Sequence, residues 1–243
     1  MNTSPRRALV TGGSGDIGSA IARGLAGDGC SVIVHANSNI ERAEAVATEI
    51  REAGGQAAAI AFDVTDAQAS KEALEFLLAD GPIPIIVNNA GIHDDAPMAG
   101  MSEQQWRRVI DVSLNGFFNV TQPLLLPMAR TRFGRIVSVS SVAGVLGNRG
   151  QTNYAAAKAG LHGASKSLAR EMASRGVTVN VVAPGMIEGS MLGELYDKAQ
   201  IKAMVPAGRP GTAAEVAALV CFLCSEAAAY INGQVIGVNG GMG

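Results

Sequence analysis

The chain has 243 residues, 19 of them basic and 21 acidic, which gives a formal charge of -2 at neutral pH. This length suits one large α/β domain, and a hydrophobic fraction of 48% can build a core without disulfides or a structural metal. The balanced charge argues against a nucleic-acid partner, and every apolar run is shorter than the roughly 18 residues that cross a membrane. We therefore expect one domain over residues 1–243, located in the cytoplasm, with no metal site and no membrane span.

Short apolar, β-branched runs alternate along the chain with longer Ala-, Leu- and Glu-rich stretches that have helical spacing. Strands are predicted at residues 8–11, 31–35, 58–62, 85–88, 134–140, 178–183 and 235–238. Helices are predicted to begin near Asp16, Ile40, Asp66, Ser102, Thr152 and Thr212. This alternation indicates βαβ units and an α/β, doubly wound fold with a seven-stranded parallel sheet. Ligands of such sheets bind at the carboxyl ends of the strands.

A glycine-rich turn, TGGSGDIG at residues 11–18, joins the first predicted strand to the first helix. Glycines let the backbone approach a pyrophosphate, and a helix N-terminus offers N–H groups and a partial positive charge to it. We therefore predict nucleotide binding at this turn, with a plain tight turn as the alternative.

Residues 186–209 break the alternation, with prolines, glycines and a weakly amphipathic piece around residues 193–205. We interpret this segment as a mobile cover over the site. Further on, Cys221 and Cys224 lie on one face of an apolar helical run, which favours core packing over redox chemistry.

Tyr154 and Lys158 are four residues apart in a predicted helix, so their side chains lie on one helix face. An ammonium group beside a phenol favours the phenolate and should lower the tyrosine pKa from about 10, which suits proton transfer near neutral pH. Ser141 follows the fifth strand, where it can hydrogen-bond a substrate carbonyl oxygen. The alternative is an ordinary solvated Tyr/Lys pair.

Together these motifs resemble the short-chain dehydrogenase/reductases. The turn resembles that family's TGxxxGxG turn, and NNAG at residues 88–91, Tyr154-x3-Lys158 and VNGG at residues 238–241 follow in register. Residues 150–184, 206–209 and 228–242 look most like the bacterial 3-oxoacyl-[acyl-carrier-protein] reductases. The resemblance implies a single-domain Rossmann-like fold in which a nicotinamide delivers hydride to a ketone. Tyr154 would then protonate the ketone oxygen, Ser141 would orient it, and Lys158 would hold the nicotinamide ribose.

The resemblance also implies a set of cofactor-binding residues spread over the strand ends. Besides Tyr154 and Lys158, they are Gly12, Ser14, Gly15, Asp16, Ile17, Gly18, Asn37, Ser38, Asp63, Val64, Asn89, Ala90, Gly91, Pro184, Gly185 and Ile187. Residues 35–39, at the end of the second strand, contain no Asp or Glu that would repel the extra phosphate of NADPH. With Asn37, Ser38 and the nearby Arg42 as phosphate partners, we expect NADPH as the cofactor.

The chain departs from the family at several site positions. Ser113 stands where a catalytic Asn is usual; we expect its main-chain carbonyl to keep the proton relay from Lys158, and Asn115 is the alternative if a bulge turns it inward. Asp16 replaces the family's middle glycine and would repel a pyrophosphate unless it caps the helix and points away. Gly189 stands where the family has a Thr, and Ser190 beside it is a candidate substitute.

The resemblance implies NADPH-dependent reduction of a 3-oxoacyl thioester bound to an acyl carrier protein, in fatty-acid synthesis or in a dedicated polyketide or aryl-polyene pathway. Arg132 and Arg175 match basic positions that dock the carrier, although exposed arginines are usually only solvated. A homotetramer is expected by analogy. Two alternatives are a reductase or dehydrogenase of a free alcohol, sugar or steroid ketone, and a cofactor-binding regulatory or scaffold subunit with weak catalysis.

Overall fold

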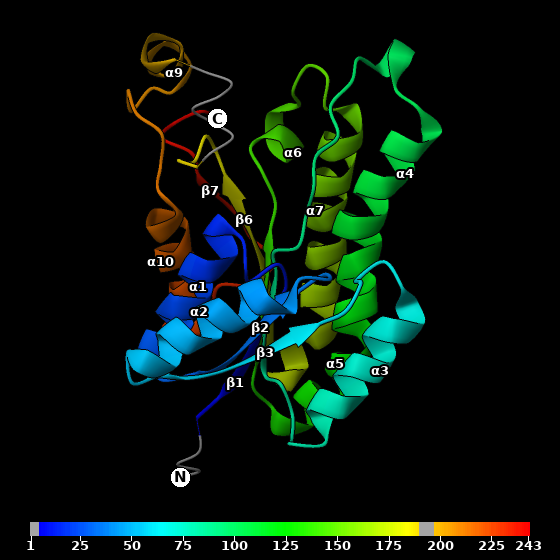
Figure 1. The fold of residues 1–243 in the computed structure, drawn as a ribbon, viewed down its shortest axis with the longest axis vertical. Coiled ribbons are helices and arrows are strands. Elements are labelled where there is room, and N and C mark those ends of the chain that lie inside the picture. The colour runs from blue at the N-terminus through cyan, green and yellow to red at the C-terminus, as the bar shows by residue number, and fades with distance from the viewer. Residues whose placement is uncertain (1–4, 190–196) are drawn as a thin grey trace.

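One parallel sheet forms the centre of the computed structural model, which describes residues 5–189 and 197–243. Its strands lie in the order β3-β2-β1-β4-β5-β6-β7 (Figure 1). They are β1 (Arg7–Val10), β2 (Ser31–Ala36), β3 (Gln56–Ala61), β4 (Ile85–Asn88), β5 (Gly134–Val139), β6 (Val177–Pro184) and β7 (Val235–Val238). The predicted strands and the predicted fold class are confirmed, with small shifts at the strand ends.

The helices follow the strands along the chain. They are α1 (Asp16–Gly27), α2 (Ile40–Glu52), α3 (Ala67–Leu78), α4 (Glu103–Ile110), α5 (Gly116–Thr131), α6 (Ala143–Leu146), α7 (Thr152–Met172), α9 (Lys198–Met204) and α10 (Ala213–Cys224). The predicted starts are confirmed, and three of them have a local side-chain cap. The side chains of Asp66, Ser102 and Thr212 accept hydrogen bonds from the first backbone N–H groups of α3, α4 and α10.

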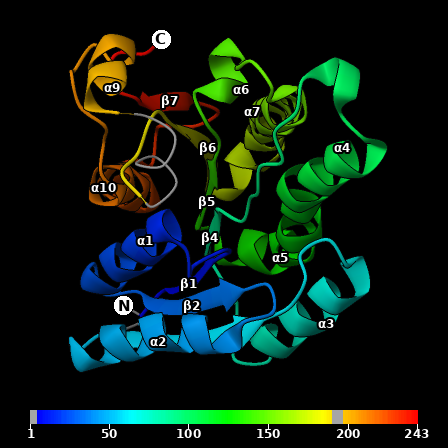
Figure 2. The same cartoon turned by 45° about the horizontal axis from the view of Figure 1, so that its top comes forward.

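Helices cover both faces of the sheet, as Figure 2 shows. On one face, Val10 and Val34 belong to a buried cluster with α1, α2 and α10. On the other, Leu9 and Ile33 belong to a buried cluster with α3, α5 and α7. Successive residues of a strand point to opposite faces, so strands covered on both sides are apolar throughout.

The strand order reverses beside β1, which pairs with β2 on one side and with β4 on the other. At such a switch point the loops after the two strands separate and leave a crevice at the carboxyl ends. The glycine turn follows β1 and the NNAG segment begins at the end of β4, so both border this crevice.

Two details differ from the helices that the sequence predicted. The long helical stretch after Ser102 contains a π-helical segment, η2 (Asp111–Asn115), between α4 and α5. In the cover, residues 190–196, and Ser190 with them, lie outside the described residues, while Ile187 forms a parallel bridge with Gly211. The later part of the weakly amphipathic piece predicted around residues 193–205 forms α9. Within the described ranges, no helix is long and apolar enough to span a membrane.

Candidate active site

The glycine turn leads directly from β1 into the N-terminus of α1. Gly12 has a φ of 60°, a left-handed conformation that favours glycine. Gly18 is packed so closely that a Cβ there would lie 2.2 Å from the Gly12 carbonyl oxygen. Among the described residues no side chain caps α1. The first N–H groups of the helix are therefore left without a side-chain acceptor, as the predicted phosphate site requires.

Thr11 and Asn89 join this turn to the end of β4. The Asn89 amide donates to the carbonyl oxygens of Thr11 at 2.9 Å and Gly12 at 3.1 Å. The Thr11 hydroxyl oxygen accepts the backbone N–H groups of Asn89 and Ala90, each at 3.0 Å. Asn89 and Ala90, predicted as cofactor contacts, thus brace the phosphate turn.

His35, near the end of β2, also contacts the turn. Its side chain is buried; Nδ1 accepts the Gly12 N–H at 3.1 Å, and Nε2 lies 2.8 Å from the Phe62 carbonyl oxygen. Burial lowers the pKa of His35 to about 4. The sequence reasoning assigned His35 no role. The available signal was a polar side chain inside an otherwise apolar strand.

Ser141, Tyr154 and Lys158 meet beyond the carboxyl end of β5. The Lys158 side chain is only 3% exposed. Its Nζ donates to the Val139 carbonyl oxygen at 2.9 Å and lies 5.5 Å from the centre of the Tyr154 ring. Burial lowers the pKa of Lys158 to about 8.

The electrostatics of Tyr154 differ from the prediction. Burial raises the pKa of Tyr154, while a hydrogen bond with Ser141 works in the opposite direction and the Asp95 carboxylate adds to the rise. The expected lowering of this pKa by Lys158 is therefore wrong for the chain alone. Loss of water from around the phenolate outweighs the hydrogen bond with Ser141, which is the contact that opposes the rise.

Asn153, which the sequence reasoning missed, fixes the start of α7. It is fully buried, donates to the carbonyl oxygens of Asp94 at 2.9 Å and Gln105 at 3.1 Å, and accepts the Tyr154 N–H at 2.8 Å. The residue before Tyr154 thus ties α7 to the loop after β4 and to α4. A buried amide at a helix start is hard to identify from sequence, because its partners come from distant elements.

Ser113 lies in η2 and faces inward. Its hydroxyl is buried and has no hydrogen-bond partner among the described residues. A Cβ added to Gly91 would lie 2.9 Å from the Lys158 Nζ and 3.5 Å from the Ser113 Oγ, so Ser113 and Lys158 approach the same backbone position. Asn115 is exposed and donates to the Asp111 carboxylate at 2.6 Å. The alternative that Asn115 turns inward is therefore wrong.

The remaining predicted cofactor residues border the same edge of the sheet. Asn37 and Ser38 are exposed directly after β2. After β3, the Asp63 carboxylate accepts the Thr65 N–H and hydroxyl, each at 2.8 Å, and Val64 is buried. Pro184 ends β6, and Gly185 and Ile187 follow it.

Asp16 is not the cap of α1. Gly15 takes the N-cap position and Asp16 is the first helical residue. The Asp16 side chain extends toward the cover, where a Cβ on Gly189 would lie 2.9 Å from its Oδ2. The carboxylate thus stands at the N-terminus of the helix and beside the start of the cover.

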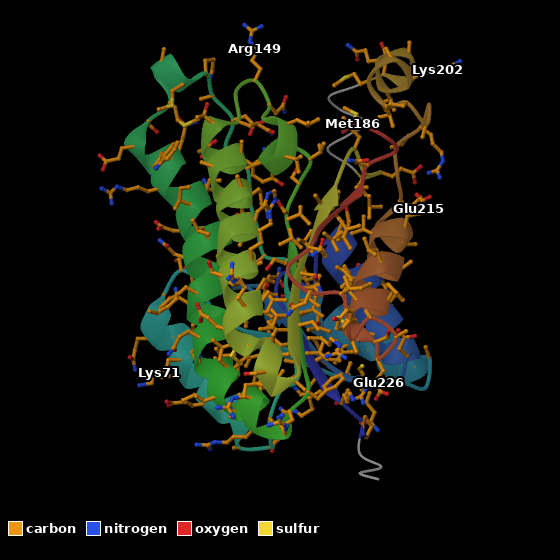
Figure 3. The ribbon with its side chains drawn as sticks, turned by 180° about the vertical axis from the view of Figure 1, so that it is seen from behind. Lys71, Arg149, Met186, Lys202, Glu215 and Glu226 are labelled. Atoms are coloured by element: carbon orange, nitrogen blue, oxygen red, sulfur yellow. The ribbon has the colours of Figure 1, made fainter. Side chains whose placement is uncertain are left out.

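The opposite edge of the sheet holds a cavity of about 1690 Å³, lined by residues that include Arg7, Cys30, Cys221 and Glu226. Figure 3 shows Glu226 in the lower half of the view and Met186, which follows β6, in the upper half. Burial raises the pKa of Cys221 to about 12, and both Cys221 and Cys224 pack with the core, as predicted. This cavity is remote from the tyrosine and lysine.

Arg132 and Arg175, the predicted carrier contacts, also lie at that opposite edge. Both are exposed, they precede β5 and β6 respectively, and the Arg132 guanidinium donates to the Ser174 carbonyl oxygen at 3.4 Å. Ser141, by contrast, follows the carboxyl end of β5. The structure does not bring the two arginines together with the Ser141, Tyr154 and Lys158 cluster.

Comparison with known proteins agrees with this architecture. The family model described as short chain dehydrogenase matches residues 6–200. The 3-oxoacyl-[acyl-carrier-protein] reductase FabG of Aggregatibacter actinomycetemcomitans is 47% identical over 239 residues, which cover 96% of this chain and 98% of that protein. FabG of Escherichia coli (strain K12) is 47% identical over 245 residues, covering 100% and 99%. Nodulation protein G of Rhizobium sp. (strain N33) is 46% identical over 240 residues, covering 98% and 96%. With a matching glycine turn and the serine, tyrosine and lysine gathered at the strand ends, the chain belongs to the short-chain dehydrogenase family.

Proposed function

We propose that the chain is an NADPH-dependent reductase that converts a 3-oxoacyl thioester, carried by an acyl carrier protein, into the 3-hydroxyacyl product. The observation that carries the proposal is the meeting of Ser141, Tyr154 and Lys158 at the edge of the sheet that also holds the glycine turn. Full-length relatives named as 3-oxoacyl-[acyl-carrier-protein] reductases support the choice of substrate.

The residues present fit a dinucleotide. The open N–H groups at the start of α1 suit a pyrophosphate, and the close packing of Gly12 and Gly18 keeps side chains away from it. Residues 35–39 carry no acidic side chain, which favours NADPH over NADH. Asn37 and Ser38, both exposed after β2, are the proposed phosphate partners.

The chemistry divides between the cofactor and the protein. When bound, the nicotinamide supplies the hydride for the carbonyl carbon. Tyr154, whose raised pKa keeps it protonated, donates its proton to the carbonyl oxygen, and Ser141 holds that oxygen with a second hydrogen bond. Lys158 stabilises the phenolate that remains, because its ammonium group lies 5.5 Å from the ring centre. Ser113 is the proposed relay position next to Lys158.

Carrier docking at Arg132 and Arg175 is part of the proposal and has a geometric consequence. The six residues of β5 separate Arg132 from Ser141 by about 20 Å. A carrier bound at these arginines would therefore have to extend its thioester over this distance to reach Ser141 of the same subunit. Charge reversal at both arginines should abolish activity on carrier-bound substrate and spare a small thioester mimic; equal effects on both substrates would contradict docking.

The test of the reaction is NADPH oxidation with an acetoacetyl thioester. Tyr154→Phe should lower kcat by at least about 100-fold, because it removes the proton donor. Tyr230→Phe is the matched control, since Tyr230 is fully exposed, and should keep wild-type activity. Near-wild-type turnover of Tyr154→Phe would refute the assigned role. A wild-type protein that reduces free ketones but no thioester would refute the substrate, and one that binds NADPH without turnover would be a binding subunit.

A further inference from the structure

His35 is a buried polar side chain that the proposed mechanism does not use. It belongs to β2, and its ring lies 4.3 Å from the ring of Phe62, centre to centre. The side chain is 1% exposed, although the strand ends beside the crevice. A polar group buried this deeply requires hydrogen-bond partners, and the identity of those partners indicates its role.

Both ring nitrogens have partners, and together they define the tautomer. The Gly12 backbone N–H can only donate, so Nδ1 must carry a lone pair; the Phe62 carbonyl can only accept, so Nε2 must carry the hydrogen. Only the neutral ring satisfies both contacts. The charged group that faces the ring is the Asp63 carboxylate. Its negative charge raises the His35 pKa by less than burial lowers it.

The first contact sets the shape of the glycine turn. The Gly12 N–H is bound by the His35 ring at 3.1 Å, and the Gly13 N–H is bound by the His35 carbonyl oxygen at 2.8 Å. One residue of β2 therefore holds two successive N–H groups of the turn. The cofactor phosphates would then bind the N–H groups at the start of α1. The direction of these N–H groups depends on the path of the glycine turn.

The second contact reaches the other side of the proposed cofactor site. Phe62 follows β3 and immediately precedes Asp63 and Val64. The resemblance to the short-chain dehydrogenases implies that Asp63, with Val64 beside it, contacts the adenine of the cofactor, so we call residues 62–64 the adenine loop. The ring of His35 thus spans from the phosphate turn after β1 to the adenine loop after β3. The His35 side chain therefore hydrogen-bonds both segments.

We propose that His35 is a positioning residue of the dinucleotide site: without touching the ligand, it holds the phosphate turn and the adenine loop at a fixed separation. The inference rests on the proposed cofactor site and goes beyond it by naming a determinant of affinity outside the contact set. It requires that loss of the two hydrogen bonds weakens cofactor binding and leaves the chemistry of bound substrate unchanged.

The test compares two variants of His35 with a control in the same strand. His35→Phe keeps an aromatic ring against Phe62 and removes both hydrogen bonds, and His35→Asn restores an acceptor for the Gly12 N–H. Ile33→Ala is the control, because Ile33 is buried two residues earlier on the same face of β2 and packs in the core cluster on that side. NADPH affinity is measured by fluorescence titration, with kcat, KM and urea unfolding alongside.

We expect His35→Phe to raise the NADPH Kd and KM about tenfold, with kcat at saturation within about twofold of wild type. His35→Asn should recover most of the affinity. Ile33→Ala should unfold at lower urea and bind NADPH as wild type does. Unchanged affinity in His35→Phe, or an equal loss in Ile33→Ala, would overturn the inference while the proposed function stands. A wild-type protein that binds no NADPH would overturn both.

The free protein offers a readout that is independent of activity. In a nitrogen-15 NMR spectrum, His35 should show the neutral form with hydrogen on Nε2 at pH 7, and addition of NADPH should shift its Nδ1 signal through the Gly12 contact. The chain has three histidines, so the His35→Asn spectrum assigns the signal by its loss. A protonated ring, or hydrogen on Nδ1, would contradict the contact on which the inference depends.

Discussion

Replacement of Lys158 by methionine should make the free protein more stable while it removes reductase activity. The ammonium group of Lys158 is almost completely buried, and among the described residues its hydrogen bond goes to the neutral carbonyl of Val139. A buried charge without a counter-charge destabilises the fold, and methionine matches the aliphatic part of the side chain without carrying a charge.

The magnitude follows from the pKa. A fall from 10.5 to about 8 corresponds to about 3.4 kcal/mol at about 1.4 kcal/mol per pKa unit. Loss of the hydrogen bond to Val139 offsets about 1 kcal/mol of this. We therefore expect Lys158→Met to raise the free energy of unfolding by about 2 kcal/mol at pH 7.

The effect has a defined pH window. Below pH 8 the lysine is protonated in both the folded and the unfolded state, so the full cost of burying the charge is present. Between pH 8 and pH 10.5 the folded protein loses this proton first, so wild-type stability rises with pH relative to Lys158→Met. Above pH 10.5 the lysine is neutral in both states and the advantage of methionine disappears.

Urea unfolding at pH 7 and at pH 10.5 measures this difference. Lys166→Met is the matched control, since Lys166 lies two turns further along α7 and is exposed; it should change stability by less than about 0.5 kcal/mol at both pH values. A Lys158→Met protein that is no more stable than wild type at pH 7 would refute the reasoning. So would a gain that persists unchanged at pH 10.5.

Three further predictions concern other parts of the site. The unfolded chain binds a proton at His35 near pH 6.5 and the folded protein only near pH 4, so wild-type stability should fall by up to about 3 kcal/mol as the pH drops through this range. Urea unfolding should show that the stability of His35→Asn depends less on pH. An equal pH dependence in the two proteins would contradict the assignment. Ser113→Asn should keep or raise kcat, because the main-chain carbonyl remains in the proposed relay; a collapse in turnover would show that the hydroxyl is required. Asn37→Asp should lower the ratio of kcat/KM for NADPH to that for NADH at least about tenfold, by repulsion of the extra phosphate; an unchanged ratio would place the phosphate elsewhere.

The strands, the helix starts and the phosphate turn could be predicted from the sequence because each has a local cause. Strands covered on both sides are apolar throughout, and a capping side chain acts within three residues of its own position. The proximity of Tyr154 and Lys158 is local in the same sense, since one helical turn brings them together. Each of these features is determined within one short stretch of chain, so the sequence of that stretch is enough to predict it.

The features that were missed depend on elements distant in the chain. His35 binds Gly12, 23 residues earlier, and Phe62, 27 residues later, so its partners become visible only when β1, β2 and β3 are aligned. The pKa of Tyr154 was predicted with the wrong sign because spacing shows the neighbouring ammonium group but not the burial of the phenol. The π-helical segment that turns Ser113 inward and leaves Asn115 exposed likewise depends on packing against the rest of the molecule.

Three residues of the proposed site, Lys158, Ser113 and Tyr154, lie in unusual environments for their side chains. Lys158 holds a buried charge, the Ser113 hydroxyl is buried without a partner among the described residues, and Tyr154 has a raised pKa. The charge and the unpaired hydroxyl would be more favourable in water, whereas the neutral Tyr154 phenol carries no such cost; all three residues lie at the same edge of the sheet. A fold selected for stability alone would not place a buried charge and an unsatisfied hydroxyl beside the Gly91 backbone, whereas a site that stabilises a polar ligand gains from both. The unfavourable terms therefore argue for function at this edge independently of any resemblance, and Lys158→Met is the substitution that separates stability from function there.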